Sequence, residues 1–473
     1  MENKNNASIK HGSYSMLMVV LVLAFLVAAN ILVQKLPTGM TAYDMSDIKL
    51  YSISDKTKEV VRSLEEDVTI YLIGETGEQD QILSQMLALY DDQSSKVHVK
   101  ELDKNGGFAT LKKYGLENET IENGSILVAS EERMKFIPAS DIYELDYAKY
   151  MQYQTEMYNY DGEGEVTSAL IYVTTKDIPK ICRVIGHEEL ALGDTILSAI
   201  KKASYELTEV NLATSSIPDD CDILLINAPA RDYTADEANK VRDYLDRGGK
   251  LFLDCTYENY ETESFKSLLE YCGIELKKGV VFEQADRCQQ PEAPFAYFAN
   301  VSSSAPITKE MSQNTYAFVY ISTGLYTSEM KRTSLTLTPF LQTTSGSFLR
   351  VEYETNDKIS KTETDLGGPI TIGLTGEDSV SGMKMVVLGT PNLASNNVLN
   401  AFPNTLNLDI YIASLNYLCA FDKSVSIPIK STDFGQNIYM ASTRNLSLIL
   451  TVAVLPIVVL LIGFIVWYKR RNR

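Results

Sequence analysis

Residues 180–282 constrain the fold most, because short apolar runs alternate there with amphipathic helical patterns. The runs 181–185, 222–227 and 250–255 are nearly continuous in apolar residues, which is typical of strands buried on both faces of a sheet. The segments between them repeat apolar residues at the spacing of a helix face. Strands that alternate with helices of this length predict a wound parallel sheet covered on both sides. We therefore predict an α/β domain over residues 176–425, ending in a β-rich extension.

Local signals mark both ends of one helix in this domain. Thr234 and Glu237 are spaced as a capping box, in which each side chain bonds to the backbone of the other. Gly248 and Gly249 then supply a left-handed stop before Lys250. A phosphate-binding loop joins a strand to a helix, whereas this glycine pair joins a helix to a strand. The sequence therefore predicts no ATP hydrolysis by a P-loop.

A smaller α/β domain is predicted over residues 35–142. Ser54 is a suitable N-cap for its first helix. Strands at 68–73 and 97–102 flank a second helix, and a short helix and a hairpin follow. This order has a thioredoxin-like outline but lacks the CxxC motif that would supply redox chemistry. Residues 143–175 form a tyrosine-rich connector and a helix; both a stacking platform for sugars or peptides and an interdomain seam fit the tyrosines.

Apolar segments near both ends predict membrane anchors. Residues 14–33 and 446–468 each approach or exceed the roughly 20 apolar residues that cross a bilayer. For the first segment, a signal peptide cleaved near Ala29 is the alternative, although the apolar run continues past that point. We therefore predict an α/β body flanked by one transmembrane helix at each end.

Basic residues orient these anchors. The basic tail 469–473 follows the second segment directly, which marks the cytoplasmic side. Lys4 and Lys10 place residues 1–13 on the same side. The α/β domains, together with a linker at 426–445, are therefore predicted to be extracytoplasmic, held at the cytoplasmic (inner) membrane with both termini in the cytoplasm.

Composition limits the partners. A formal net charge of −19 argues against nucleic acid, because phosphate binding needs a basic patch. The six cysteines show no metal-like spacing. An even count permits disulfides in an exported domain, but the apolar surroundings of Cys182, Cys255, Cys272 and Cys419 favour buried free thiols.

His187, Glu188 and Glu189 are the candidate ligand-binding residues. They follow the first strand of the wound sheet, and open α/β sheets bind ligands beyond the carboxyl ends of their strands. The two carboxylates would equally well stabilise the positive end of the next helix. No second histidine lies at ligand spacing, so we predict neither a metal nor a cofactor.

The order of elements is similar to that of class I glutamine amidotransferase-like domains, and Cys255 ends one of the strands. A cysteine nucleophile there needs a tight elbow flanked by small residues. Residues 256–259 contain no glycine, which favours a degenerate fold without catalysis. The alternative is a cell-surface hydrolase or amidotransferase that uses Cys255 and His187.

Motifs spread along the chain resemble the GldG-like family, the auxiliary subunits of gliding-motility-associated ABC transporters. The turn 186–189 is similar to that family's GHGE-type turn, with Glu188 in place of glycine. Two departures are Ala305, where the family often has histidine, and the loosely similar region 402–404. The other similar segments are 51–54 ahead of Thr57, 165–170, 244–250, 368–369, 416–418 and the terminal span with its basic tail.

This resemblance implies a non-catalytic, membrane-anchored auxiliary or substrate-binding-like subunit of an ABC transporter. It would act with a separate permease and a separate ATPase, on a ligand that the sequence does not identify. A cell-envelope scaffold without a small ligand is a further alternative.

Overall fold

The computed structural model describes residues 52–77, 80–117, 119–145, 158–284, 286–290, 292–309, 316–351, 360–403 and 405–419, together with residues 24, 311, 427, 430 and 431. The predicted anchors 14–33 and 446–468 lie outside the described residues, except for Ala24. Within the described part of the chain, no helix has both the length and the apolar character needed to cross a bilayer. The chain divides into two units, 1–142 with 161–428 and 143–160 with 429–473.

The N-terminal part of the first unit contains a four-stranded sheet in the order β2-β1-β3-β4. Strand β1 (Val68–Gly74) pairs in parallel with β2 (Val97–Asp103) and antiparallel with β3 (Ser125–Ala129). Strand β3 and β4 (Met134–Ile137) form the predicted hairpin. The helices are α3 (Asp55–Arg62), α4 (Gln81–Gln93), α5 (Phe108–Lys113) and α6 (Ala139–Ile142).

Helix α8 (Gly162–Thr174) packs against this part through a buried polar network. The Thr57 hydroxyl donates to Glu163 Oε1 at 2.7 Å and lies 3.1 Å from the Thr167 hydroxyl. The Tyr90 hydroxyl lies 2.7 Å from the same Thr167 oxygen. Ser54 caps α3, as predicted, by accepting from the backbone N–H of Thr57. Because buried polar groups need partners, these bonds fix α8 on α3 and α4.

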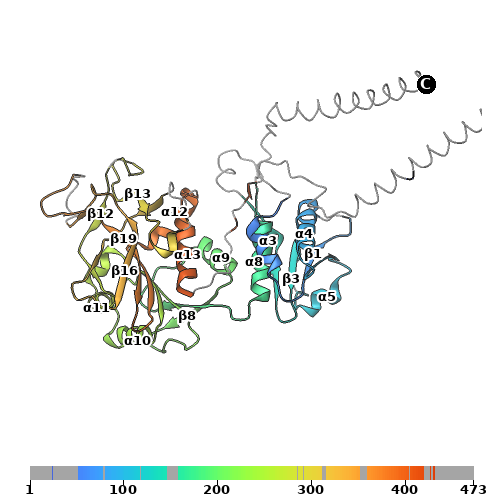
Figure 1. Ribbon diagram of the computed structural model, residues 1–473, viewed down its shortest axis with the longest axis horizontal. Helices are drawn as coiled ribbons and strands as arrows, with labels where there is room; N and C mark the ends of the chain where they lie inside the picture. The colour runs from blue at the N-terminus through green and yellow to red at the C-terminus, as the bar shows by residue number, and fades with distance from the viewer. Residues whose placement is uncertain are drawn as a thin grey trace, which may run out of the picture. The chain divides into compact units, whose positions relative to one another are not determined.

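The rest of the first unit is organised by a nine-stranded mixed sheet in the order β14-β13-β16-β19-β20-β10-β9-β7-β8 (Figure 1). The five strands from β20 to β8 are parallel, and the four from β14 to β19 are antiparallel to their neighbours. Their bounds are β7 (Lys180–Ile185), β8 (Glu206–Asn211), β9 (Ile223–Asn227), β10 (Lys250–Asp254), β13 (Ala296–Val301), β14 (Ala317–Tyr320), β16 (Leu335–Gln342), β19 (Thr371–Asp378) and β20 (Lys384–Leu388).

The strands predicted from residues 180–282 to form a wound parallel sheet, β7 to β10, do pair in parallel. The segment after residue 282, predicted as a β-rich extension of this domain, continues the same sheet, because β20 pairs in parallel with β10 and antiparallel with β19. More than 100 residues separate β10 from β20 along the chain. A periodicity that extends over ten residues contains no information about such a pairing.

Helices cover both faces of the parallel half, as predicted. Successive residues of a strand point to opposite faces, so Leu225 and Phe252 pack into one cluster while Leu224 and Leu251 pack into the other. The first cluster includes α9 (Asp194–Lys202) and α13 (Asn407–Cys419), and Figure 1 shows both helices on the side away from α11. The second includes α10 (Ala235–Asp246) and α11 (Glu263–Tyr271). Both predicted ends of α10 are present: the Thr234–Glu237 capping box, and Gly248 at φ +84°.

Short elements complete this part: 3-10 helices η1 (Tyr257–Glu261), η2 (Pro306–Thr308) and η3 (Pro391–Ala394), helix α12 (Asn396–Ala401), and the strands β11 (Ile274–Leu276), β12 (Val280–Phe282), β15 (Leu325–Thr327), β17 (Phe348–Arg350) and β18 (Leu366–Gly367). In the second unit, β5 (Tyr143–Leu145), β6 (Tyr158–Tyr160) and β21 (Lys430–Ser431) form a small antiparallel sheet. Most of the predicted tyrosine-rich connector lies outside the described residues.

Candidate binding pocket at the carboxyl edge of the sheet

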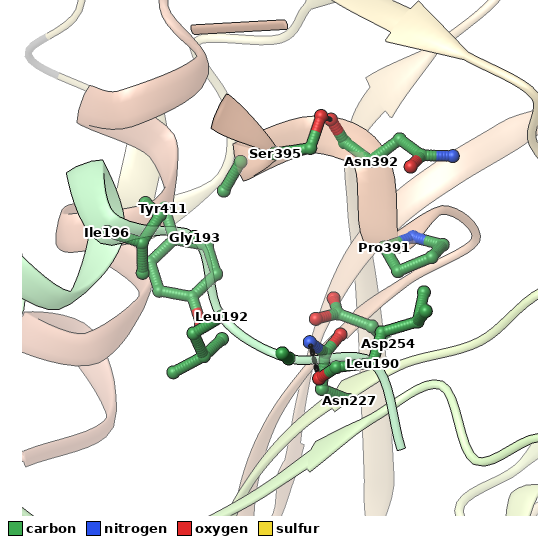
Figure 2. Close-up of a pocket in the computed structure, with 12 residues that line it drawn as sticks. Leu190, Leu192, Gly193, Ile196, Asn227, Asp254, Pro391, Asn392, Ser395 and Tyr411 are labelled. Carbon is green, nitrogen blue, oxygen red and sulfur yellow. Dashed lines mark hydrogen bonds between the residues drawn. The ribbon is translucent and has the colours of Figure 1, made fainter. Parts of the chain in front are cut away.

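A cavity of about 150 Å³ lies at the carboxyl ends of β9 and β10 (Figure 2). Loop 190–193 and Ile196 of α9 form one part of its wall. Residues 391, 392 and 394 of η3, together with Ser395, form another. The last residues of β9 and β10 and Tyr411 of α13 supply its buried polar groups. This is the edge at which parallel α/β sheets bind ligands.

Asn227 and Asp254 are the terminal residues of their strands and pair in register across them. They are only 4% and 2% exposed. The amide nitrogen of Asn227 donates to the Leu190 carbonyl at 2.7 Å, shown as a dashed line in Figure 2. That bond fixes the amide orientation, because the opposite assignment would set two oxygens against each other. Asn227 Oδ1 and Asp254 Oδ1 have no hydrogen-bond partner among the described residues.

Tyr411 contributes a third buried polar group. Its ring packs on Phe252 with centroids 4.7 Å apart, and its hydroxyl finds no hydrogen-bond partner among the described residues. Burial raises the pKa of Tyr411 well above its usual value, and the Asp254 carboxyl adds to the shift. Each buried polar atom costs roughly 1–3 kcal/mol if left unsatisfied, and this cavity contains three of them.

The electrostatic setting of Asp254 is equally unusual. Burial raises the pKa of this carboxyl well above its usual value. None of the residues that line the cavity is a lysine, an arginine or a histidine. Burial therefore favours the protonated carboxyl in the empty pocket, and no basic side chain of the cavity wall favours its ionised form.

Loop 190–193, which forms part of the pocket wall, is held in place by contacts at both of its ends. The backbone N–H of Leu190 donates to the Asn227 carbonyl at 3.0 Å, which ties the loop to the end of β9. A Cβ atom on Gly193 would lie 2.4 Å from Asn396 Oδ1. That same oxygen accepts from the backbone N–H of Thr195 at 3.1 Å. A side chain at position 193 would therefore press on Asn396 and disturb this bond between α9 and α12.

The predicted ligand-binding residues His187, Glu188 and Glu189 lie immediately before this loop, and none of the three lines the cavity. His187 is 9% exposed, with Nδ1 3.6 Å from Glu189 Oε1 and Nε2 3.3 Å from Glu237 Oε2. Glu188 faces outward and pairs with Arg231. The structure thus brings His187 and Glu189 together and directs Glu188 away. Their role in ligand binding stays a prediction.

Glu237 links this histidine to the start of α10. Its carboxylate accepts from the backbone N–H and the hydroxyl of Thr234, at 2.8 and 2.7 Å. Burial opposes ionisation of Glu237, but these hydrogen bonds and the nearby His187 outweigh it and lower the pKa. Across the described part of the chain, no group of three His, Cys, Asp or Glu side chains is arranged to hold a metal ion.

Cys255 has the properties of a core residue. It is fully buried, its thiol donates to the Leu388 carbonyl at 3.3 Å, and it does not line the cavity. Burial raises the pKa of the Cys255 thiol, and the neighbouring Asp254 adds to the shift. A nucleophilic cysteine needs a lowered pKa and access to substrate, so this geometry speaks against the hydrolase alternative.

Asn227, Asp254 and Tyr411 were missed as site residues from the sequence. A signal for the first two exists, since a polar residue ends each of two buried apolar strands. Tyr411 carries no such signal, because only the assembled fold brings α13 to these strand ends.

Two family models match the chain. Residues 178–405 match a family described as an ABC-type uncharacterized transport system, and residues 47–133 match a domain of unknown function (DUF7088). No curated protein matches the sequence. The first match covers slightly less than half of the chain and contains every residue of the cavity wall except Tyr411.

Solved structures are similar only at a distance. The mmIFT52 N-terminal domain is 16% identical, with a TM-score of 0.38, and the likeness covers 52% of this chain and 100% of that one. A glutamine amidotransferase from Thermotoga maritima is 8% identical, with a TM-score of 0.28, over 51% of this chain and 98% of that one. These scores carry no argument about function. The family match is what informs function: residues 178–405 are similar to a family described as an ABC-type uncharacterized transport system.

Proposed function

We propose that this chain is a membrane-anchored, non-catalytic auxiliary subunit of an ABC transporter, acting with a separate permease and a separate ATPase. The observation that carries the proposal is the family match over residues 178–405. The motifs that resemble the GldG-like family also point to an auxiliary subunit of an ABC transporter.

Two features of the chain indicate which steps of transport its partner subunits perform. Gly248, Gly249 and Lys250 join α10 to β10, in the wrong order for a phosphate-binding loop. Two single anchors, at 14–33 and 446–468, are too few to line a path through the membrane. ATP hydrolysis and the translocation path are therefore assigned to partner subunits.

The sequence also supports a location. With both anchors in the cytoplasmic membrane and the basic tail 469–473 inside, the α/β domains lie on the extracytoplasmic side. The pocket would then face the compartment from which, or into which, the complex moves its substrate.

The cavity favours a ligand-binding role over a purely structural one. In a purely structural scaffold, apolar residues of the same shape could replace these three unpartnered polar groups at little cost or with a gain in stability. We therefore propose that the pocket at the ends of β9 and β10 binds a small ligand.

Co-purification tests the proposed complex. The tagged full-length chain, extracted in a mild detergent, is expected to bring a multi-span permease and a P-loop ATPase in constant ratio. An unrelated protein with two single anchors and the same tag serves as the control. Recovery of the chain alone, under conditions that keep other ABC complexes intact, would contradict the proposal.

A further inference from the structure

We propose that the pocket binds a small organic cation, with a protonated amine on Asp254 and Asn227. This inference rests on the proposed ligand-binding role and names the chemical class of the ligand.

The hydrogen-bonding capacity of the pocket favours a ligand with several donors. Asn227 Oδ1 can only accept, because the nitrogen of the same amide is already bonded to Leu190. A bound cation would hold Asp254 ionised, although burial favours the protonated form in the empty pocket, and an ionised carboxyl can likewise only accept. These two groups end adjacent strands at paired positions, and neither Oδ1 atom has a donor among the described residues. A ligand that satisfies both must supply at least two hydrogen-bond donors at one point, as an ammonium group does.

The charge of the cavity wall favours a cationic ligand. The cavity wall has one acidic side chain, Asp254, and no basic one. An anionic ligand would meet Asp254 and no cation in the cavity wall; Arg183, whose charge acts on Tyr411, lies outside the wall and is paired with Glu209. A cationic ligand would supply a charge-assisted hydrogen bond in a setting shielded from water, where such bonds are strongest.

The size and polarity of the cavity favour a small ligand with an apolar part. A cavity of about 150 Å³ holds a molecule such as benzene, with about six non-hydrogen atoms. Leu192, Ile196 and Ala394 supply apolar wall, which fits a short hydrocarbon portion. A hydrated metal ion would leave these side chains without an apolar partner, so the wall favours an organic amine over an inorganic cation. The Tyr411 hydroxyl remains available to donate or accept at a further polar group.

Matched probes test this inference on the full-length chain in detergent. The probes are 3-methylbutylammonium, the uncharged 3-methylbutan-1-ol and the anion 3-methylbutanoate, at equal concentration and ionic strength. We expect only the ammonium ion to raise the melting temperature in a saturable way, because only a ligand that binds the folded state stabilises it. Potassium chloride at the same concentration controls for an inorganic cation.

Two variants locate the effect. Asp254→Asn should abolish the shift caused by the ammonium ion, and Tyr411→Phe, which keeps the ring packing, controls for pocket shape. The matched control is Asp219→Asn, which makes the same chemical change at an exposed carboxylate before the amino end of β9 and should retain the shift. Equal shifts with the amine and the alcohol, an equal shift with potassium, or a full shift in Asp254→Asn would overturn the inference.

The thermal-shift experiment and the co-purification experiment can fail independently of each other. If the permease and the ATPase co-purify but no amine shifts the melting temperature, the ligand class is wrong and the transport role stands. If the amine binds through Asp254 but no partner co-purifies, the transport role is wrong and the ligand class stands.

Discussion

Replacing Asp254 by asparagine should stabilise the ligand-free protein, and the gain should grow with pH. The carboxyl is 2% exposed, and burial holds its pKa well above the usual value. The folded state therefore keeps its proton at pH values where the unfolded chain, with a carboxyl pKa of about 3.9, has lost it. As pH rises above that value, the free energy of unfolding falls, because the unfolded state alone gains from ionisation.

The magnitude follows from this linkage. Between the unfolded and folded pKa values, each pH unit removes about 1.4 kcal/mol from the free energy of unfolding. From pH 5 to pH 7 the loss is therefore at most about 3 kcal/mol. Asparagine has nearly the same shape and does not titrate, so the variant escapes this loss. Below about pH 4 the carboxyl is protonated in both states, and the advantage of the variant should vanish.

Urea unfolding of the full-length protein in detergent, followed by circular dichroism at pH 5 and pH 7, measures the effect. The midpoint of Asp254→Asn should exceed that of the wild type, and the gap should be larger at pH 7. Asp219→Asn, which changes an exposed carboxylate, should show no such widening. A gap that is constant with pH, or a destabilised Asp254→Asn, would refute the reasoning. Stability gained at the expense of ligand binding is the trade-off expected at a functional site.

Three further predictions follow from single contacts. Arg350 and Asp365 form a buried ion pair, with Nε 3.1 Å from Oδ2. Arg350→Met should therefore lower the free energy of unfolding in urea by about 3–5 kcal/mol, and adding Asp365→Leu should recover much of this loss. A double variant as unstable as the single one would contradict the prediction. Gly193→Ala places a Cβ atom against Asn396, so it should weaken amine binding more than it lowers the unfolding midpoint; unchanged binding would argue against the role given to this loop. Cys255 should react with a thiol probe only after unfolding, as mass spectrometry of the labelled peptide would show; rapid native labelling would revive the hydrolase alternative.

The sequence predicted those parts of the fold that local patterns control. Alternating strands and helices over residues 180–282, and the capping box of Thr234 and Glu237, appear in the structure as expected. Pairing between distant segments could not be predicted in this way. Strand β20 joins β10 across a long insertion, and this pairing turns the expected parallel sheet into a mixed one.

The candidate site shows the same difference between local patterns and contacts of distant segments. The turn 186–189 pointed to the carboxyl edge of the sheet, and the cavity opens one residue further along, at Leu190. Asn227 and Asp254 are polar ends of apolar strands, a signal that is visible in the sequence once strand ends are inspected. Tyr411 arrives from a helix near the end of the described chain, and only tertiary packing places it in the pocket.

Reconstitution tests the central claim most directly: that an auxiliary subunit of an ABC transporter acts through this pocket. The permease and the ATPase would be incorporated into liposomes with the wild-type chain, with Asp254→Asn, or without either, and ATP hydrolysis measured with and without 3-methylbutylammonium. The account predicts that the wild-type chain makes the ATPase rate depend on the amine and that Asp254→Asn does not. An ATPase rate that is the same in all three preparations would contradict it.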